Sequence, residues 1–400
     1  MKNDMDVRWL DSRPVTSAFP HSGRAAARFA LMFTVAGTLV AQYPGLTLPP
    51  SGKNQKAEVT QYIGPVRVAI EYSSPAVHTA DGKDRRGEIW GKLVPYGLAD
   101  LGPFGNGKPD PWRAGANENT VFTISDDVTI NGKPLATGRY GLHMIPGKEE
   151  WTLIFSKNAG AWGSFSYDDS ADALRVVVKP HPHEYREYLE YDFPVRKPAE
   201  AVAELQWEEL AVPWTIGVAN INDIYISRLR QELTTVPGFN WQGFQSAAQY
   251  CLQENTHLEQ GLQWADASIN KPFVGEANFT TLSTKAQILS KMGRESEAKP
   301  IMDTAIKLPS ATPQAIHQYG RQLLADKKVD EAMAVFQYNA SRNGDAWPVH
   351  VGLARGYAAK GDTKLALEHA RKGLAQAPDP LNKASLEAMV KALESGKSIN

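Results

Sequence analysis

Apolar and polar residues alternate with a period of two along the first half of the chain. Between Val66 and Tyr72 every second residue is apolar, which is typical of a strand with one buried face. Asn131-Gly132 supplies the left-handed backbone of a tight hairpin turn. The same pattern predicts strands at 66–72, 120–125, 128–130, 139–145, 151–155, 174–178, 189–193, 202–208 and 214–218.

These predicted strands follow one another without an amphipathic helix between them. A parallel sheet needs helical crossovers, so their absence favours an antiparallel sheet protein. We therefore predict a β-sandwich domain over 61–219.

Beyond Pro237-Gly238 the hydrophobic period changes to 3.6, which indicates helices. Small residues recur at one phase, Ala298, Ala332 and Ala366, each 34 positions from the next. Thirty-four residues is the tetratricopeptide period, and the chain resembles tetratricopeptide repeats over about 280–395. The resemblance implies a curved scaffold that binds peptides or other subunits. The alternative is a helical buttress that steadies the sandwich.

The full organisation predicted is a β + α chain, an antiparallel β-sandwich followed by an α-helical tetratricopeptide-like repeat domain. A fourth, degenerate repeat is expected near 244–270. The predicted boundaries are a signal peptide at 1–42, a linker at 43–60, the sandwich at 61–219, a second linker at 220–240 and the helical repeats at 241–396.

The predicted signal peptide places the protein in the periplasm or outside the cell. Arg24 and Arg28 precede an apolar run from Phe29 to Ala41, the order found in a secretory signal. This run is shorter than the roughly 20 residues of an ordinary membrane span, so no span is expected in the mature chain. Whether the segment is cleaved or kept as an anchor stays open.

Charge and cysteine content exclude several classes of function. The chain has 43 Lys and Arg and 44 Asp and Glu, a net charge of −1, so nucleic acid is not an expected partner. Its one cysteine, Cys251, excludes an intrachain disulfide framework and a multi-thiolate metal cluster.

Four short sequence motifs inside the predicted sandwich domain occur together in a known family. They are Tyr72-Ser73-Ser74-Pro75, Gly91-Lys92-Leu93-Val94-Pro95-Tyr96-Gly97, Trp112-Arg113-Ala114-Gly115-Ala116-Asn117-Glu118 and Gly141-Leu142-His143-Met144-Ile145-Pro146-Gly147. Over about 65–218 the chain resembles a bacterial family of proteins of unknown function, numbered twenty-nine eleven. The resemblance implies a domain boundary and no catalytic roles.

The long polar stretch from Ser73 to Asn119 is the expected place for a site, because loops of this length in compact domains often carry function. His78, Glu118 and His143 would form a two-histidine, one-carboxylate set suited to zinc or iron if they converged. The opposite interpretation is that each histidine hydrogen-bonds the loop backbone.

A second candidate chemistry in the same stretch is recognition of an anion. Arg86, Arg113 and Asn117 could bind a carboxylate, sulfate or phosphate, with Trp90 and Trp112 as aromatic contacts. Alternatively, Arg113 pairs with Glu118 to hold the loop, and the tryptophans fill the sandwich.

These observations favour an exported binding or scaffold protein. Its sandwich loop would bind a small polar or anionic ligand, and its helical repeats would dock a protein partner. The alternative is a metal-dependent hydrolase with His78, Glu118 and His143 in its site. Whether the protein is an enzyme stays open.

Overall fold

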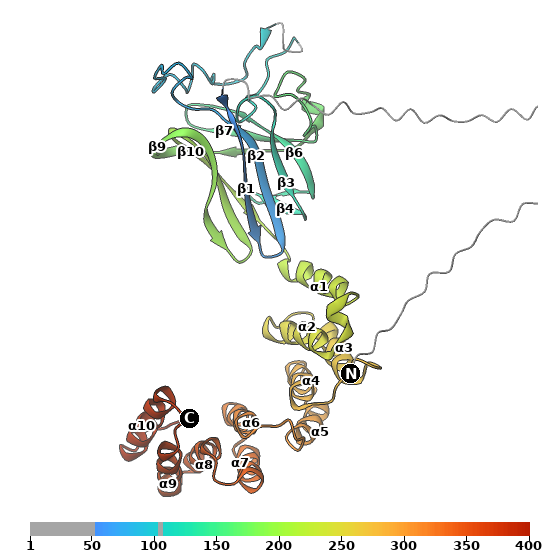
Figure 1. The fold of residues 1–400 in the computed structure, drawn as a ribbon, viewed down its shortest axis with the longest axis vertical. Helices are drawn as coiled ribbons and strands as arrows, with labels where there is room; N and C mark the ends of the chain where they lie inside the picture. The colour runs from blue at the N-terminus through green and yellow to red at the C-terminus, as the bar shows by residue number, and fades with distance from the viewer. Residues whose placement is uncertain (1–52, 103–106) are drawn as a thin grey trace, which may run out of the picture. The chain divides into compact units, whose positions relative to one another are not determined.

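The computed structural model describes residues 53–102 and 107–400 (Figure 1). The predicted signal peptide and most of the first predicted linker lie outside these residues. Within them the chain forms two antiparallel sheets and then a series of helices, as the sequence predicts.

The two sheets pack face to face as a β-sandwich. One sheet has six strands in the order β1-β2-β3-β6-β7-β8, and the other has four in the order β5-β4-β10-β9. The strands are β1 (Gln55–Ile63), β2 (Val66–Ser74), β3 (Thr120–Ile124), β4 (Val128–Ile130), β5 (Lys133–Leu135), β6 (Gly138–Ile145), β7 (Trp151–Ser156), β8 (Asp172–Val178), β9 (His181–Lys197) and β10 (Glu200–Gly217).

Large apolar side chains from both sheets fill the space between them. Trp151 and Phe155 from β7 meet Trp207 and Trp214 from β10 in one continuous core, and all four are fully buried. Because this core includes the alternate residues predicted to face inward along β2, the period-two pattern identified the buried face correctly.

The structure differs from the predicted strands in four elements. β5 was not predicted, and β9 extends well beyond the predicted strand at 189–193. β1 lies partly within the predicted linker at 43–60. It was not predicted as a strand because it is an edge strand whose outward residues are polar. The predicted strands 202–208 and 214–218 are one long strand, β10, whose pairing with β9 shifts register near Glu208. Such bulges interrupt the alternation that marks a strand in sequence.

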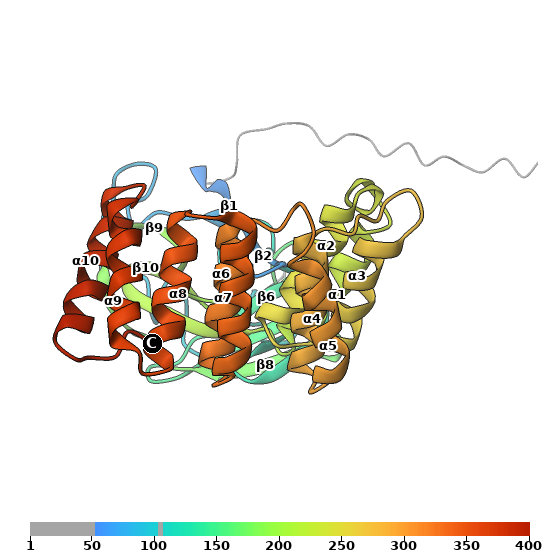
Figure 2. The same cartoon turned by 90° about the horizontal axis from the view of Figure 1, so that it is seen from below.

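Ten α-helices follow the sandwich in the described part of the chain. The helices are α1 (Ile221–Glu232), α2 (Trp241–Gln253), α3 (Leu258–Asn270), α4 (Phe279–Lys291), α5 (Glu295–Ala305), α6 (Pro313–Ala325), α7 (Val329–Asn343), α8 (Trp347–Ala359), α9 (Thr363–Ala375) and α10 (Pro380–Glu394). Helices α2 to α9 pack as four successive hairpins, which lie side by side in Figure 2. The segment 220–240, predicted as a linker, holds α1 and a short 3-10 helix at Val236–Phe239.

The 34-residue phase corresponds to helix packing. Ala298, Ala332 and Ala366 lie on α5, α7 and α9, the second helix of each hairpin, and all three are buried. Gly320 is a further small residue at such a contact, because a Cβ added there would lie 2.2 Å from the ring of Phe336. Small residues are therefore required where the helices approach one another closely.

None of the described helices has the length and apolar character needed to cross a membrane.

Candidate functional site

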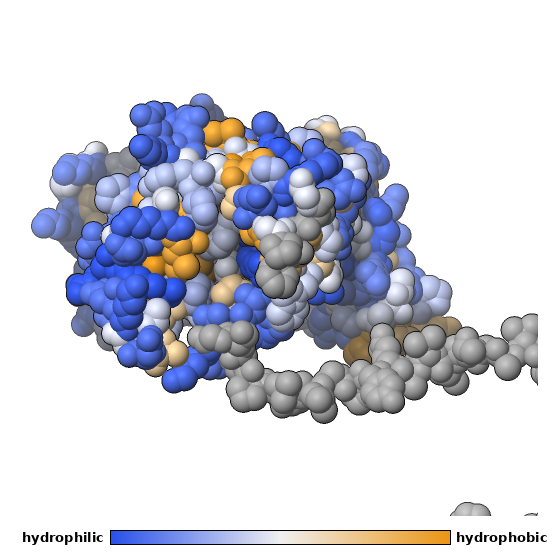
Figure 3. All heavy atoms as spheres, turned by 90° about the horizontal axis from the view of Figure 1, so that it is seen from above, coloured by the Kyte–Doolittle hydropathy of each residue, from blue (hydrophilic) through white to orange (hydrophobic). Residues whose placement is uncertain are grey.

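The long connection between β2 and β3 folds over one end of the sandwich and forms a pocket there. The pocket has a volume of about 740 Å³ and is lined by this loop together with parts of β9 and β10. Figure 3 views this end of the molecule, where hydrophobic patches lie among hydrophilic side chains. The half-exposed Leu93 is both an apolar surface residue and part of the pocket lining. We call this cavity the loop-end pocket.

Four tryptophans pack against one another beneath the loop-end pocket. Trp90 lies with its ring centre 5.9 Å from Trp112, 5.1 Å from Trp151 and 5.6 Å from Trp207. Trp151 and Trp207 are fully buried, so the cluster is part of the sandwich core. Trp112 and Trp207 also line the pocket, stacked at 6.5 Å. The tryptophans thus fill the sandwich and form a wall of the pocket.

Arg85 contributes a fixed cation to the loop-end pocket. Its Nε donates to the Val77 carbonyl at 3.0 Å, and its Nη2 donates to the Ala76 carbonyl at 2.6 Å. No carboxylate of the described residues lies within ion-pair distance of this guanidinium. Two of its nitrogens are therefore held by the backbone, while Nη1 has no hydrogen-bond partner in the described chain.

His78, in the loop after β2, is held by Glu187 of β9. The backbone N–H of His78 donates to Oε1 of Glu187 at 2.8 Å, and Nδ1 of the imidazole lies 2.8 Å from Oε2. The Tyr185 hydroxyl donates to the same carboxylate at 2.5 Å. Burial alone would raise the pKa of Glu187, but the hydrogen bonds from Tyr185 and His78 lower it below its ordinary value. Both carboxylate oxygens of Glu187 therefore already accept hydrogen bonds.

Of the predicted ligand-binding residues, only Trp112 lines this pocket. Arg86 pairs instead with Asp84 at 2.6 Å, and this contact lowers the pKa of Asp84 to about 2. Arg113 donates to the Asn117 carbonyl at 2.5 Å and lies over the Phe165 ring at 4.7 Å. Arg86, one of the residues predicted to bind an anion, is thus paired with Asp84, and it is the neighbouring Arg85 that lines the pocket.

The structure does not bring the three predicted metal ligands together. His78 contacts Glu187, whereas Glu118 accepts from the Ser73 hydroxyl at 3.1 Å and lies 3.4 Å from Lys56. In the described residues no three His, Cys, Asp or Glu side chains are grouped so that they could hold a metal ion. The alternative pair of Arg113 with Glu118 is also not formed, because each has other partners.

His143 lies buried on the outer face of β6, beneath the connection that follows β7. Its Nδ1 is 3.0 Å from the hydroxyl of Ser164, which is itself buried. Burial and the nearby charge of Arg113 lower the pKa of His143 to about 4, so the imidazole is neutral at pH 7. His143 therefore has the environment of a core residue.

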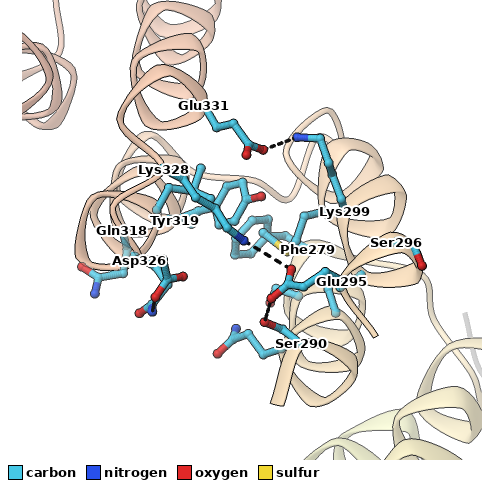
Figure 4. Close-up of a pocket in the computed structure, with 18 residues that line it drawn as sticks. Phe279, Ser290, Glu295, Ser296, Lys299, Gln318, Tyr319, Asp326, Lys328 and Glu331 are labelled. Atoms are coloured by element: carbon cyan, nitrogen blue, oxygen red, sulfur yellow. Dashed lines mark hydrogen bonds and ion pairs between the residues drawn. The ribbon is translucent and has the colours of Figure 1, made fainter. Parts of the chain in front are cut away.

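A second cavity lies within the helical part, between the hairpin α4/α5 and the hairpin α6/α7. Its volume is about 540 Å³. Figure 4 shows the residues that line it. Helix α6 packs closely on α8, and α2 on α4, but α4 and α6 make no comparable contact. We call this cavity the inter-hairpin pocket.

The inter-hairpin pocket is apolar at its base and charged at its rim. The base is formed by the buried Met302 and Leu323 and the half-buried Phe279 and Tyr319. At the rim, Lys328 lies 3.4 Å from Glu295, and Lys299 pairs with Glu331, so two ion pairs connect the hairpins (Figure 4). Since these four side chains are largely exposed, the ion pairs contribute little stability.

Sequence reasoning missed the residues that contribute most to the loop-end pocket. Arg85 was visible in the polar stretch, but nothing in the sequence distinguishes it from Arg86. Glu187, Tyr188 and Trp207 lie on β9 and β10, more than 100 residues along the chain from His78, and only the sheet pairing brings them near the loop.

Solved structures that match part of this chain include tetratricopeptide-repeat proteins. YrrB, titled a TPR protein with an unusual peptide-binding site, has 16% identity and a TM-score of 0.29, covering 41% of this chain and 86% of that one. The C-terminal part of a TPR repeat-containing protein from Cytophaga hutchinsonii has 14% identity and a TM-score of 0.33, covering 43% and 66%. MamA from Desulfovibrio magneticus RS-1 has 15% identity and a TM-score of 0.27, covering 39% and 93%.

A comparison with curated proteins gives no match to this chain. For the sandwich domain, a family model confirms the resemblance that its sequence motifs indicated. Residues 54–216 match the family described as a protein of unknown function, DUF2911.

Proposed function

We propose that this protein is an exported binding and scaffold protein. Its tetratricopeptide-like helices dock a protein partner, and its sandwich binds a small polar or anionic ligand in the loop-end pocket. The observation that supports partner docking is the inter-hairpin pocket, an open cavity of about 540 Å³ in an architecture suited to protein binding.

The lining of the inter-hairpin pocket suits a peptide segment of a partner. Its apolar base can bury an apolar side chain, as the centres of protein interfaces do. Gln287 and Gln318 at the rim expose amide groups that can form hydrogen bonds with a peptide backbone. Asp326 adds a carboxylate, which accepts a hydrogen bond from the amide of Gln322 at 3.1 Å. The exposed ion pairs around the rim can exchange partners at small cost.

Site-specific photo-crosslinking in the native host tests partner docking. A photo-reactive residue in place of Gln318 lies in the inter-hairpin pocket, and one in place of Glu387 lies on the exposed side of α10 as the matched control. We expect one protein to crosslink at position 318 and not at position 387. Crosslinking at neither position, or equally at both, would contradict docking in the pocket.

The proposed export is supported by the charged flank and the apolar run at 29–41. Mass spectrometry of the protein from its host should give a mature amino terminus between about residues 41 and 43. An intact Met1 on a cytoplasmic chain would refute this part of the proposal, without bearing on the pockets.

A further inference from the structure

The loop-end pocket contains a cation with an unused donor, beside carboxylates that already accept hydrogen bonds from other groups. Arg85 is anchored by the carbonyls of Ala76 and Val77, and its Nη1 has no hydrogen-bond partner among the residues that the structure describes. Glu187 already accepts from the backbone and ring of His78 and from Tyr185. Asp81 accepts from the Thr79 hydroxyl. The unused donor of Arg85 calls for an acceptor, and a charged acceptor forms the strongest hydrogen bond with a guanidinium.

The balance of charge limits how negative the ligand can be. The charged residues that line the pocket are Lys53, Asp81, Arg85 and Glu187, two cations and two carboxylates. A doubly charged phosphate would meet a pocket with no net positive charge, close to two carboxylates. A singly charged carboxylate needs only one cation, which Arg85 supplies.

The uncharged part of the lining is aromatic and apolar. The backbone of Tyr188 pairs with that of Ala76, which places this residue beside the carbonyl that anchors Arg85. Tyr188 and Leu93 are 57% and 47% exposed, although both line the pocket, and Trp112 forms a further wall. Exposed aromatic and apolar surface beside a fixed polar group is the pattern of small-molecule sites.

We infer that the loop-end pocket binds a small monocarboxylic acid whose carboxylate meets Arg85 and whose ring lies against Tyr188 and Trp112. The inference rests on the proposed function, because it names the ligand class of the same pocket. The cavity, about 740 Å³, accommodates a body of one or two rings. Aromatic acids and sugar acids both present this chemistry.

Binding to the full chain can be measured by ligand-observed NMR with four probes. Naphthoate carries the carboxylate on an aromatic body, and glucuronate carries it on a sugar ring. Naphthamide is the uncharged match of naphthoate, and inorganic phosphate tests general anion binding. We expect naphthoate or glucuronate to bind, naphthamide to bind at least about tenfold more weakly than naphthoate, and phosphate not to compete. Whichever acid binds more tightly identifies the source of the carboxylate.

Two adjacent arginines provide matched variants. Arg85→Gln should weaken binding of the carboxylate probe at least about tenfold. Arg86→Gln should leave it unchanged, because Arg86 pairs with Asp84 and does not line the pocket. Since Arg85 also anchors the loop, Tyr188→Ala serves as a second variant that removes only an exposed side chain, and several-fold weaker binding is expected.

Three results would overturn the inference: phosphate binding as tightly as the acids, naphthamide binding as tightly as naphthoate, or equal effects of Arg85→Gln and Arg86→Gln. If none of the four probes binds, the ligand-binding half of the proposed function fails as well. Partner docking by the helices is tested separately by the crosslinks at position 318, so the two failures are distinguishable.

Discussion

The two pockets are assembled in different ways. In the sandwich, His78 meets Glu187 across 109 positions of sequence, and Gly87 meets Glu208 across 121. In the helical part, the ion pairs at the rim join residues 32 and 33 positions apart, about one repeat. A repeat architecture builds its sites from neighbouring units, whereas a sandwich builds them from strands that are distant in the chain. The helical pocket therefore depends on local packing and the loop-end pocket on the whole sheet topology.

Acidification should weaken both regions through one buried histidine in each, and this is the largest effect we expect. The pKa of His143 falls to about 4 and that of His317 to about 3, in both cases because of burial and then of nearby arginines. The unfolded chain binds these protons near pH 6.5, so the stabilisation is complete above pH 6.5 and is lost as the pH falls toward the folded values. The loss is roughly 3–5 kcal/mol per site.

The histidine effect can be measured region by region. Near-ultraviolet dichroism reports mainly on the sandwich, which holds most of the described tryptophans, although Trp241, Trp264 and Trp347 of the helices also contribute. Far-ultraviolet dichroism follows the helices. The pH dependence of unfolding between pH 4 and 6.5 should become flatter for the sandwich in His143→Gln and for the helices in His317→Gln. An unchanged slope in either variant would mean that the imidazole is not the buried neutral group described here.

Overpacking one helix hairpin should affect only the helical region. In Ala332→Trp an indole replaces a methyl group at a fully buried contact of α7, which should cost roughly 1–3 kcal/mol or more. Thermal unfolding followed by far-ultraviolet dichroism should shift down while the tryptophan-cluster signal of the sandwich is retained. Ala325→Trp, at an exposed position of α6, is the control and should change little. Loss of both signals together would show that the two regions are not independent.

Removing Arg113 should have an intermediate effect on the sandwich. Arg113 has no carboxylate partner among the described residues, so Arg113→Ala removes one backbone hydrogen bond and a contact with the Phe165 ring, at a cost of about 1–2 kcal/mol. The same change should raise the pKa of His143, because the Arg113 charge lowers it. Chemical denaturation and NMR titration of the imidazole measure the two effects. A loss as large as that of a broken buried ion pair would contradict the assignment.

Glu118→Gln should have the smallest effect. Its contact with Lys56 at 3.4 Å is exposed, and the hydroxyl of Ser73 can still donate to the amide oxygen of glutamine. We expect a change in the free energy of unfolding below about 1 kcal/mol. Chemical denaturation measures it, and a cost of several kcal/mol would mean that Glu118 has a buried cationic partner.

The sequence allowed most of the fold to be predicted, because both regions follow one hydrophobic period over many residues. The strand at 128–130 and the alanines at 298, 332 and 366 were correctly identified. β1 was missed because an edge strand with polar residues outside resembles a linker. The helix α1 was missed for a related reason, since it buries few side chains and has a weak apolar face.

The candidate site could be located from the sequence only as a loop. The choice between Arg85 and Arg86 depends on which guanidinium turns toward the carbonyls of 76 and 77 and which toward Asp84, and this is a property of the loop conformation. His143 was placed correctly on the face opposite the apolar residues of its strand, but that face is covered by the connection after β7. Alternation reports which side a residue faces and not what covers that side.

The central claim, that the loop-end pocket recognises a carboxylate through Arg85, is tested most directly by a crystal structure of the full chain with naphthoate or glucuronate, whichever binds more tightly. We predict that the carboxylate lies within hydrogen-bond distance of Nη1 of Arg85 and that the ring contacts Tyr188. An acid bound elsewhere, or bound in this pocket with its carboxylate turned away from Arg85, would contradict the claim.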